Sequence, residues 1–219
     1  MIKAVLFDLD GTLLDSAPDL VATLNHLRSA RGLSALPVDE LKHFVSRGAP
    51  GLIKAGMPPC DEEAFQQTRT AFLEHYADNC FIDTRPFDGI EVVLGKLAEA
   101  SIPWGIVTNK AEFLTLPIVK HAGWASVAGA VLCGDSLEHS KPHPAPVLAA
   151  CQLMGVLPAE TLMVGDDKRD VEAGRRAGCQ TVLVTYGYAT EQDCADLRGQ
   201  TTLIDTPEEL LALLELSVD

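Results

Sequence analysis

The sequence predicts an α/β fold: a Rossmann-like parallel sheet core covered by helices on both faces, with an inserted all-helical cap domain. Two observations predict this fold. Over most of the chain, short apolar segments alternate with helical segments, which is typical of a parallel sheet. A block of about 65 residues that follows the first apolar segment contains only helical patterns, and this block is the expected cap.

The strands of the core are expected where short apolar runs stand between turn residues. The first is expected at residues 3–7, which are apolar on both faces, as in a buried parallel strand. Further strands are expected at 103–107, 130–133, 161–165, 180–184 and 201–204. The helices between them are expected at 88–100, 111–122, 144–154, 168–177 and 207–216. In such a sheet, ligands bind at the carboxyl ends of the strands.

The insertion is expected to begin with a helix after Ser16. Leu20 and Leu24 lie on one face of that helix, and Ser16 with Asp19 three residues later predicts a capping box at its start. Gly32 is expected to close it. Further cap helices are expected at 38–46, 49–56 and 61–78. The chain is therefore divided into a core domain of residues 1–14 and 83–219 and a cap domain of residues 15–82.

Composition excludes several classes of function. The net charge of −14 argues against nucleic acid as a partner, because nucleic-acid-binding proteins need a basic face. No run of about 18 apolar residues occurs, so no membrane span is expected. The six cysteines are scattered without a C-x-x-C pair, which predicts free thiols, a reducing compartment and hence the cytoplasm. The protein is expected to be a monomer or a homodimer.

Polar residues that can take part in catalysis or ligand binding follow four of the expected strands. Because the carboxyl ends of parallel strands meet at one edge of a sheet, these side chains are expected to converge. They are Asp8 and Asp10, then Thr108 and Asn109, then Lys141, and finally Asp166, Asp167 and Asp170.

These residue types predict phosphoryl transfer. Asp8 can attack phosphorus as a nucleophile and form an acyl phosphate. Asp10, two residues further on, can protonate the leaving oxygen and then activate water. Mg²⁺ prefers hard oxygen ligands, and Asp8, the backbone carbonyl of Asp10 and Asp166 suit it. The expected cofactor is therefore Mg²⁺.

The remaining residues of this set are expected to bind phosphate or to support the site. Thr108, Asn109 and Lys141 would hold the oxygens of the transferring phosphoryl group and offset their charge. Asp167 and Asp170 stand at a helix start, where a carboxylate meets the helix dipole favourably. Each of them is expected either to lie close to the metal ion or to have a structural role.

Four motifs carry a resemblance to a known family. Asp-Leu-Asp-Gly-Thr, Val-Thr-Asn-Lys, Ser-Lys-Pro and Val-Gly-Asp-Asp-x-x-Asp occur in the order found in the haloacid dehalogenase-like hydrolase superfamily. The resemblance covers essentially the whole chain. It implies that Asp8 is the nucleophile, Asp10 the acid/base and Asp166 a metal ligand. Because dehalogenating members lack a carboxylate at the position of Asp10, the resemblance implies a phosphatase.

The insertion resembles the cap of the phosphoglycolate phosphatase-like branch of this superfamily. The turn at Arg47 and Gly48 can bring the Arg47 guanidinium over the site, where it would bind a substrate carboxylate. The branch usually has a smaller polar residue near Arg47. The sequence is also similar to N-acetylmuramate 6-phosphate phosphatase. The expected substrate is a small phosphorylated metabolite that carries a carboxylate, with phosphoglycolate as the first candidate and N-acetylmuramate 6-phosphate or another sugar phosphate as the alternative.

Two functions of other kinds compete with the phosphatase. A phosphomutase would use the same residues and would depend on a sugar bisphosphate activator. A phospho-acceptor signalling domain also places acidic residues, a Thr and a Lys around Mg²⁺. Such domains are shorter, have no helical insertion, and carry the acceptor on a middle strand.

Overall fold

The computed structural model describes residues 1–216, and its centre is a six-stranded parallel sheet. The strands lie in the order β5-β4-β1-β6-β7-β8, so β1 is central. Their bounds are β1 Ala4–Phe7, β4 Trp104–Val107, β5 Val131–Leu132, β6 Thr161–Gly165, β7 Gln180–Val184 and β8 Thr202–Ile204. The α/β fold predicted from the sequence is confirmed.

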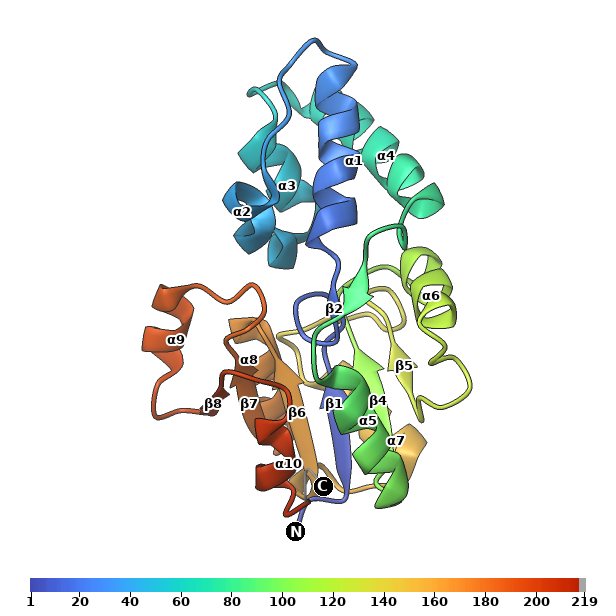
Figure 1. The fold of residues 1–219 in the computed structure, drawn as a ribbon, viewed down its shortest axis with the longest axis vertical. Coiled ribbons are helices and arrows are strands. Elements are labelled where there is room, and N and C mark those ends of the chain that lie inside the picture. The colour runs from blue at the N-terminus through green and yellow to red at the C-terminus, as the bar shows by residue number, and fades with distance from the viewer. Residues whose placement is uncertain (217–219) are drawn as a thin grey trace.

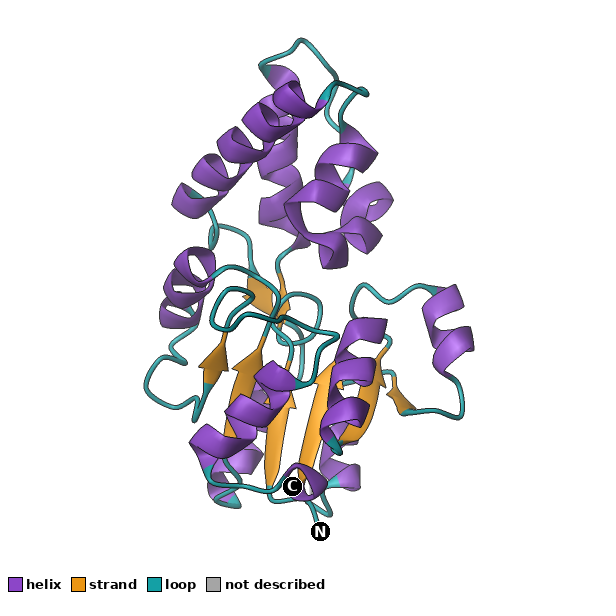
Figure 2. Ribbon diagram, turned by 180° about the vertical axis from the view of Figure 1, so that it is seen from behind, coloured by secondary structure: helices purple, strands orange, loops and turns teal. Residues whose placement is uncertain are grey.

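Helices cover both faces of this sheet, as Figures 1 and 2 show from opposite sides. They are α5 Ile90–Glu99, α6 Glu112–His121, α7 Ala145–Met154, α8 Lys168–Ala177, α9 Glu191–Leu197 and α10 Glu209–Leu213, with a short 3-10 turn η2 at Pro158–Glu160. Alternation along β1 divides the core between the two faces. Val5 and Phe7 pack into the cluster that includes α5, α6 and α10, whereas Leu6 packs with α7 and α8.

The insertion forms a bundle of helices beyond the carboxyl ends of the strands (Figure 1). Its elements are α1 Ala17–Ser29, α2 Val38–Leu41, the 3-10 helix η1 Lys42–Arg47, α3 Gly48–Gly56 and α4 Glu62–Asp78. Buried apolar side chains hold the bundle together, among them Leu24, Leu52 and Phe72. The bundle therefore stands directly above the edge of the sheet at which the polar residues were expected.

Two short antiparallel strands join the helical bundle to the sheet. They are β2 Leu14–Asp15 and β3 Arg85–Pro86, and they pair with each other where the chain leaves and rejoins the core. Sequence patterns did not predict this ribbon, because two-residue strands have no periodicity to detect.

The capping box predicted at the start of α1 is wrong. Ser16 is the N-cap residue but makes no side-chain capping bond, and its Oγ donates to Asp10 Oδ1 at 2.5 Å. Asp19 instead accepts hydrogen bonds from the backbone N–H groups of residues 82–84 and from the Thr84 hydroxyl. Its carboxylate thus fastens the second connection of the bundle to the first helix.

Two features of the core were not among the expectations from the sequence. Phe113 on α6 is exposed and lines a cavity. Helix α9 was not expected at all. It begins with a capping box between Thr190 and Asp193.

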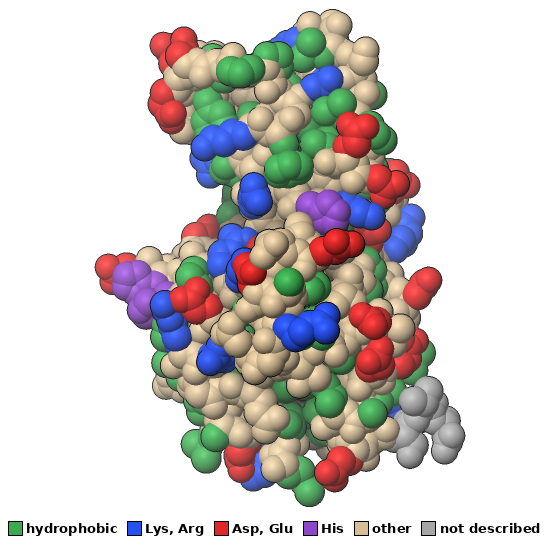
Figure 3. Space-filling model, turned by 90° about the vertical axis from the view of Figure 1, so that its left-hand side faces the viewer, with side chains coloured by type: hydrophobic (Ala, Val, Ile, Leu, Met, Phe, Trp, Pro, Cys, Tyr) green, Lys and Arg blue, Asp and Glu red, His purple; other side chains and the backbone are tan. Residues whose placement is uncertain are grey.

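All six cysteines lie in the described part of the chain and are free. Within residues 1–216, no helix is both long and apolar enough to cross a membrane. Figure 3 shows basic and acidic side chains side by side near the junction between the helical bundle and the sheet.

Candidate active site

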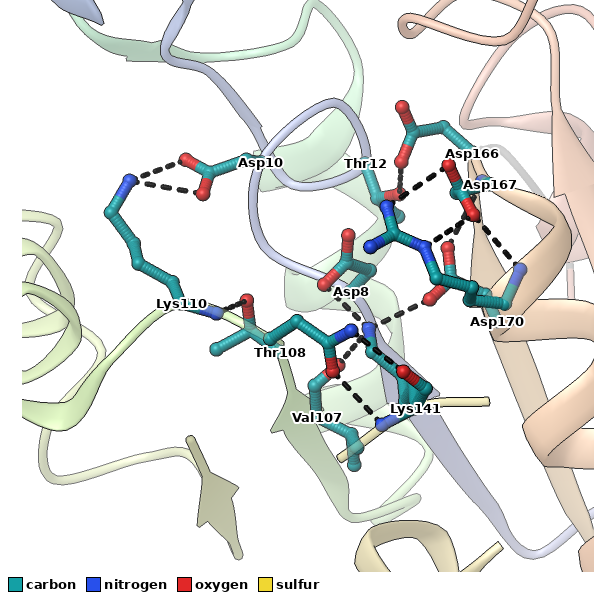
Figure 4. A network of polar contacts seen from close by, with 12 residues as sticks. Asp8, Asp10, Thr12, Val107, Thr108, Lys110, Lys141, Asp166, Asp167 and Asp170 are labelled. Carbon is teal, nitrogen blue, oxygen red and sulfur yellow. Dashed lines mark hydrogen bonds and ion pairs between the residues drawn. The ribbon is translucent and has the colours of Figure 1, made fainter. Parts of the chain in front are cut away.

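The predicted side chains converge at the carboxyl edge of the sheet (Figure 4). Asp8 directly follows β1, Thr108 follows β4, and Asp166 follows β6. These three strands are neighbours in the sheet, which is why residues far apart in sequence meet here.

Lys141 forms the centre of the first cluster of charges. Its Nζ lies 2.7 Å from Asp8 Oδ1 and 2.7 Å from Asp170 Oδ1, and it donates to the carbonyl of Val107. The Lys141 and Asp170 side chains are each only 2% exposed. Burial alone would lower the pKa of Lys141, but the charges of Asp170 and Asp8 outweigh it and raise that pKa. Lys141 is therefore a permanent cation beside Asp8.

Asn109 positions the backbone that carries Lys141. Its side-chain Nδ2 donates to the Lys141 carbonyl at 2.8 Å, and its Oδ1 accepts from the Lys141 N–H at 2.9 Å. Thr108 is buried, and its hydroxyl oxygen accepts from the Lys110 N–H. The structure brings both residues to the site, and their predicted contacts with phosphate stay predictions.

Three carboxylates form a group that suits a metal ion. Oxygens of Asp8, Asp166 and Asp170 all lie within 4.8 Å of one another. Burial, followed by the charges of Asp8, Asp170 and Asp167, raises the pKa of Asp166 well above its ordinary value. Burial is also the main cause that raises the pKa of Asp170 to about 7, although Lys141 opposes it. A divalent cation would relieve this repulsion, and hard oxygen donors are what Mg²⁺ binds, so the residues fit the predicted cofactor.

Gly11 allows the loop after β1 to lie against this carboxylate group. Its φ is +86°, and a Cβ at this position would stand 2.2 Å from Asp166 Oδ2. Any side chain would therefore suffer backbone strain and displace a candidate metal ligand. This requirement explains the glycine after Asp10.

Asp166 is oriented by further contacts. Its Oδ2 accepts from the Tyr188 N–H at 3.1 Å and from Ser46 Oγ, a group of the helical bundle, at 3.3 Å. Thr12 Oγ1 stands 3.4 Å from its Oδ1. Contacts with Asp166 thus come from the β1 loop, the loop after β7 and the helical bundle.

Asp167 and Asp170 start helix α8 as a capping box. Asp167 accepts from the Arg169 N–H, and Asp170 Oδ2 accepts from the Asp167 N–H at 3.0 Å. Asp167 is also paired with the Arg169 guanidinium, 2.8 Å away. Asp170 therefore has two contacts of different kinds, because its other oxygen is bound to Lys141. Asp167 has the contacts of a structural residue.

Asp10 belongs to a second cluster of charges. Lys110 Nζ lies 2.9 Å from both of its carboxylate oxygens and 2.9 Å from the hydroxyl of Tyr76, a residue of α4. In Figure 4 the carboxylate of Asp10 points toward Lys110, whereas that of Asp8 points toward Lys141. The backbone carbonyl of Asp10 is the predicted metal ligand. No contact in the structure tests this role, so it stays a prediction.

A cavity of about 290 Å³ lies between the helical bundle and the sheet edge. Asp8, Asp10, Lys110 and Lys141 line its lower part. Its upper wall contains apolar and basic side chains from the bundle and from α6, namely Arg47, Gly48, Arg69, Phe72, Leu73 and Phe113. The cavity therefore offers charge at one end and apolar surface with arginines at the other.

The predicted residues Arg47 and Gly48 lie at the rim of this cavity. Gly48 has a φ of +64° at the junction of η1 and α3. Arg47 is exposed, and its guanidinium carbon lies 5.4 Å from the centroid of the Phe44 ring. Its place fits the predicted role in substrate binding, and the role itself stays a prediction.

Sequence reasoning missed three residues that complete the site. Lys110 follows Thr108 and Asn109 directly, so its place at the strand end was a signal that could have assigned it a role. Tyr76 and Arg69 lie far away in sequence on α4, and no local pattern distinguishes them from other residues of an amphipathic helix.

A model of the haloacid dehalogenase-like hydrolase family matches residues 5–184. The chain belongs to this family. The match spans both charge clusters and the helical bundle. The four motifs recognised in the sequence thus all lie within the matched residues.

Curated relatives of two names match almost the whole chain. The N-acetylmuramic acid 6-phosphate phosphatase of Pseudomonas aeruginosa is 39% identical over 98% of this chain and 95% of its own length. The phosphoglycolate phosphatase of Xylella fastidiosa (strain Temecula1) is 41% identical over 95% of this chain and 91% of its own length.

A solved structure supports the same relationship. The crystal structure of a predicted phosphoglycolate phosphatase from Haemophilus somnus 129pt matches with a TM-score of 0.84 and 28% identity, over 97% of this chain and 98% of that chain. A β-phosphoglucomutase structure from Thermotoga maritima, at 20% identity and a TM-score of 0.73, shares the fold.

Proposed function

We propose that this enzyme is a Mg²⁺-dependent phosphomonoester hydrolase that works through an aspartyl-phosphate on Asp8. It is a phosphatase by family and by the names of its relatives. The observation that supports the mechanism is the position of Asp8. It lines the cavity and contacts Lys141. It also belongs to the carboxylate group with Asp166 and Asp170. A carboxylate so placed is a nucleophile with a cation beside the phosphate that it attacks.

In the first step, a carboxylate oxygen of Asp8 forms a bond to phosphorus. The bond between phosphorus and the ester oxygen breaks, and Asp10 donates its proton to the departing alcohol. Lys141 stabilises the negative charge on the phosphoryl oxygens, with Thr108 as a further donor. Asn109 supports this step by holding the backbone of Lys141.

In the second step, water releases phosphate from Asp8. Asp10, now a carboxylate, takes a proton from the water while the water oxygen forms a bond to phosphorus. The bond between phosphorus and the Asp8 oxygen breaks, which restores the Asp8 carboxylate. One residue therefore serves as acid and then as base.

Asp8, Asp166 and the backbone carbonyl of Asp10 would hold the Mg²⁺ ion, with Asp170 beside them. When bound, the ion supplies charge neutralisation for the phosphate and orients it. The excess of carboxylates over cations in this cluster supports a divalent ion.

We assign residues 15–82 to a cap domain that covers the site during the reaction. Its connections would be the hinges, because they form the narrow ribbon of β2 and β3. Ser46 and Tyr76 bring contacts from this cap to Asp166 and to Lys110 of the core. Closure of such a lid excludes bulk water, which would otherwise compete for the phosphoryl group.

The cavity favours a sugar-sized substrate that carries a carboxylate. A volume of about 290 Å³ with Leu73 and Phe113 in its wall accommodates more than a two-carbon acid. The exposed guanidinium groups of Arg47 and Arg69 can bind a carboxylate at the end away from Asp8. N-acetylmuramate 6-phosphate combines these features and is our first candidate.

Phosphoglycolate is the second candidate. It also carries a carboxylate, and a relative with this name is 41% identical. A cap that closes further over the core would bring the same arginines nearer to a shorter substrate. We place the reaction in the cytoplasm, where free thiols such as the six of this chain persist.

Phosphate release from the two candidates and from simple sugar phosphates tests this proposal. We expect turnover with Mg²⁺, none with EDTA, and none in Asp8→Asn. Glu63→Gln, an exposed change on the outer side of α4, is the control. Radioactive phosphate retained on wild-type protein after acid quench, but not on Asp8→Asn, would identify the intermediate. Turnover only with a sugar bisphosphate activator would support a mutase instead.

A further inference from the structure

Lys110 is buried at the boundary between cap and core and has no role in the steps described above. Its ammonium lies 2.9 Å from each Asp10 oxygen and from the Tyr76 hydroxyl, and 4.6 Å from the centroid of the Tyr76 ring. Its side chain is 7% exposed and that of Asp10 is 16% exposed. The three acceptors match the three N–H donors of an ammonium, so Lys110 has no donor left for phosphate.

The contacts form a continuous path from the cap to Asp10. Tyr76 is fully buried on α4, where its ring packs against Phe72. Ser16, at the start of the first cap helix, donates to Asp10 Oδ1 as well. Asp10 is therefore held by Lys110 from the core and by Ser16 from a cap connection, and Lys110 is itself held by the cap.

We propose that Lys110 is a positioning residue for Asp10, and that Tyr76 of the cap fixes Lys110 in turn. The inference rests on the proposed function, in which Asp10 is the acid and base. A carboxyl group transfers a proton only when its oxygen lies within hydrogen-bond distance of the reacting oxygen. Displacement by about 1 Å can reduce such catalysis by a factor on the order of 10².

Movement of the cap is expected to affect Asp10. When the cap moves away from the core, the Tyr76 hydroxyl leaves Lys110, and the lysine loses one of the contacts that fix its direction. Asp10 is then held less firmly. Acid catalysis would reach its full rate only while the cap covers the substrate, which links proton transfer to the exclusion of water.

Two aryl esters of similar shape test the role of Lys110. The p-nitrophenyl group leaves without needing a proton, whereas phenol leaves phenyl phosphate poorly unless an acid protonates it. The parameter to compare is kcat/KM, because it covers the steps up to departure of the alcohol. For Lys110→Met we expect kcat/KM to fall on the order of 10²-fold with phenyl phosphate and by less than about threefold with p-nitrophenyl phosphate.

Further variants separate positioning from a general loss of structure. Tyr76→Phe keeps the ring and removes only the hydroxyl, and we expect about a tenfold loss confined to phenyl phosphate. Tyr186→Phe is the matched control, because its hydroxyl donates to the Thr12 carbonyl and does not contact Asp10. In an Asp10→Asn background, Lys110→Met should cause no further difference between the two esters. Circular dichroism and thermal melting verify that each variant is folded.

Each outcome decides the question. A loss confined to phenyl phosphate that disappears without Asp10 supports positioning. Equal losses with both esters, unchanged rates, or faster turnover in Tyr76→Phe would overturn it while leaving the phosphatase intact. If folded wild-type protein hydrolyses neither ester nor any candidate substrate, the proposed function fails and the positioning role fails with it.

Discussion

The two lysine–carboxylate clusters of the site differ in which part of the chain completes them. The Lys141 cluster uses Asp8, Asp170 and the Val107 carbonyl, all of which belong to the core. The Lys110 cluster joins Asp10 of the core to Tyr76 of the cap. In the proposed mechanism, the core alone would then hold the nucleophile Asp8, whereas the acid/base Asp10 would also depend on the cap.

The two clusters also differ in how deeply their ion pairs are buried. In the Lys141 cluster, Lys141 and Asp170 are each 2% exposed and Asp8 is 13% exposed. In the Lys110 cluster, Lys110 is 7% exposed and Asp10 is 16% exposed. A buried charge depends on its partner, because water cannot replace the lost contact. The Lys141–Asp170 pair, which is the most deeply buried, should therefore matter more for folding than the Lys110–Asp10 pair.

The largest expected effect comes from breaking the core cluster. Lys141→Met leaves the buried Asp170 carboxylate, and Asp8 beside it, without their cation. We expect kcat to fall by about 10³-fold and the free energy of unfolding to fall by about 3–5 kcal/mol. Urea denaturation and steady-state kinetics measure the two effects. Lys110→Met is the matched variant and should lose less stability; equal losses from the two variants would contradict the comparison.

Metal removal is expected to have the next largest effect, and it concerns carboxylates that all belong to the core. Mg²⁺ at about 100 times its dissociation constant should stabilise the protein by about 2.7 kcal/mol. For a chain of this size that raises the melting temperature by about 5–10 °C. EDTA should abolish the rise in the wild type.

Two matched acid-to-amide variants identify the ligands. Asp166→Asn should remove the Mg²⁺-induced rise in melting temperature, because Asp166 belongs to the carboxylate group. Asp167→Asn should keep most of it, since Asp167 is paired with Arg169. A rise that survives in Asp166→Asn would place the ion elsewhere.

A smaller effect is expected when the cap wall of the cavity is changed. Arg69 is exposed on α4 and lines the cavity, as Arg47 does. Loss of a charged hydrogen bond to a substrate carboxylate should raise KM for N-acetylmuramate 6-phosphate by about tenfold in Arg69→Ala or Arg47→Ala.

An ester without a carboxylate is the control for these arginines. Hydrolysis of p-nitrophenyl phosphate should change by less than about twofold in both variants, because nothing in that substrate pairs with a guanidinium. A uniform loss with both esters would mean that the arginines support the cap rather than the substrate.

The division between core and cap also explains which site residues could be predicted from the sequence. Asp8, Thr108 and Asp166 each follow an apolar strand, and the rule that parallel strands end at one edge was enough to bring them together. The alternation of strands and helices likewise predicted the sheet. These inferences need only local patterns and one general property of the fold.

Residues that act across the boundary were beyond such patterns. Tyr76 looks like any apolar position of an amphipathic helix, and only the orientation of the cap brings its hydroxyl to Lys110. Asp19 shows that a local pattern can also predict a contact that the fold does not form. Its spacing from Ser16 matched a capping box, yet tertiary contacts with residues 82–84 took its carboxylate instead.

The smallest expected effect concerns the cap alone. His75 on α4 stacks on His26 of α1 with ring centroids 4.0 Å apart, and its Nδ1 lies 3.3 Å from Thr23 Oγ1. Burial, then the charge of His26, lowers the pKa of His75 below its ordinary value of 6.5, although Asp78 opposes the shift. The unfolded chain therefore binds the proton more tightly, so stability is lost as pH falls through about 6.5.

Melting temperatures at about pH 7.5 and about pH 5.5 measure this contribution. Because His75 is only partly buried, solvent screens part of the interaction and the change should be small. His75→Phe keeps an aromatic ring against His26 and removes the charge, so it should lose less stability in acid than the wild type. Both proteins should keep the same Mg²⁺-induced rise at neutral pH, since the metal group lies in the core. If His75→Phe instead altered that rise, the cap and the Lys141 cluster would be coupled more closely than their separate contacts indicate.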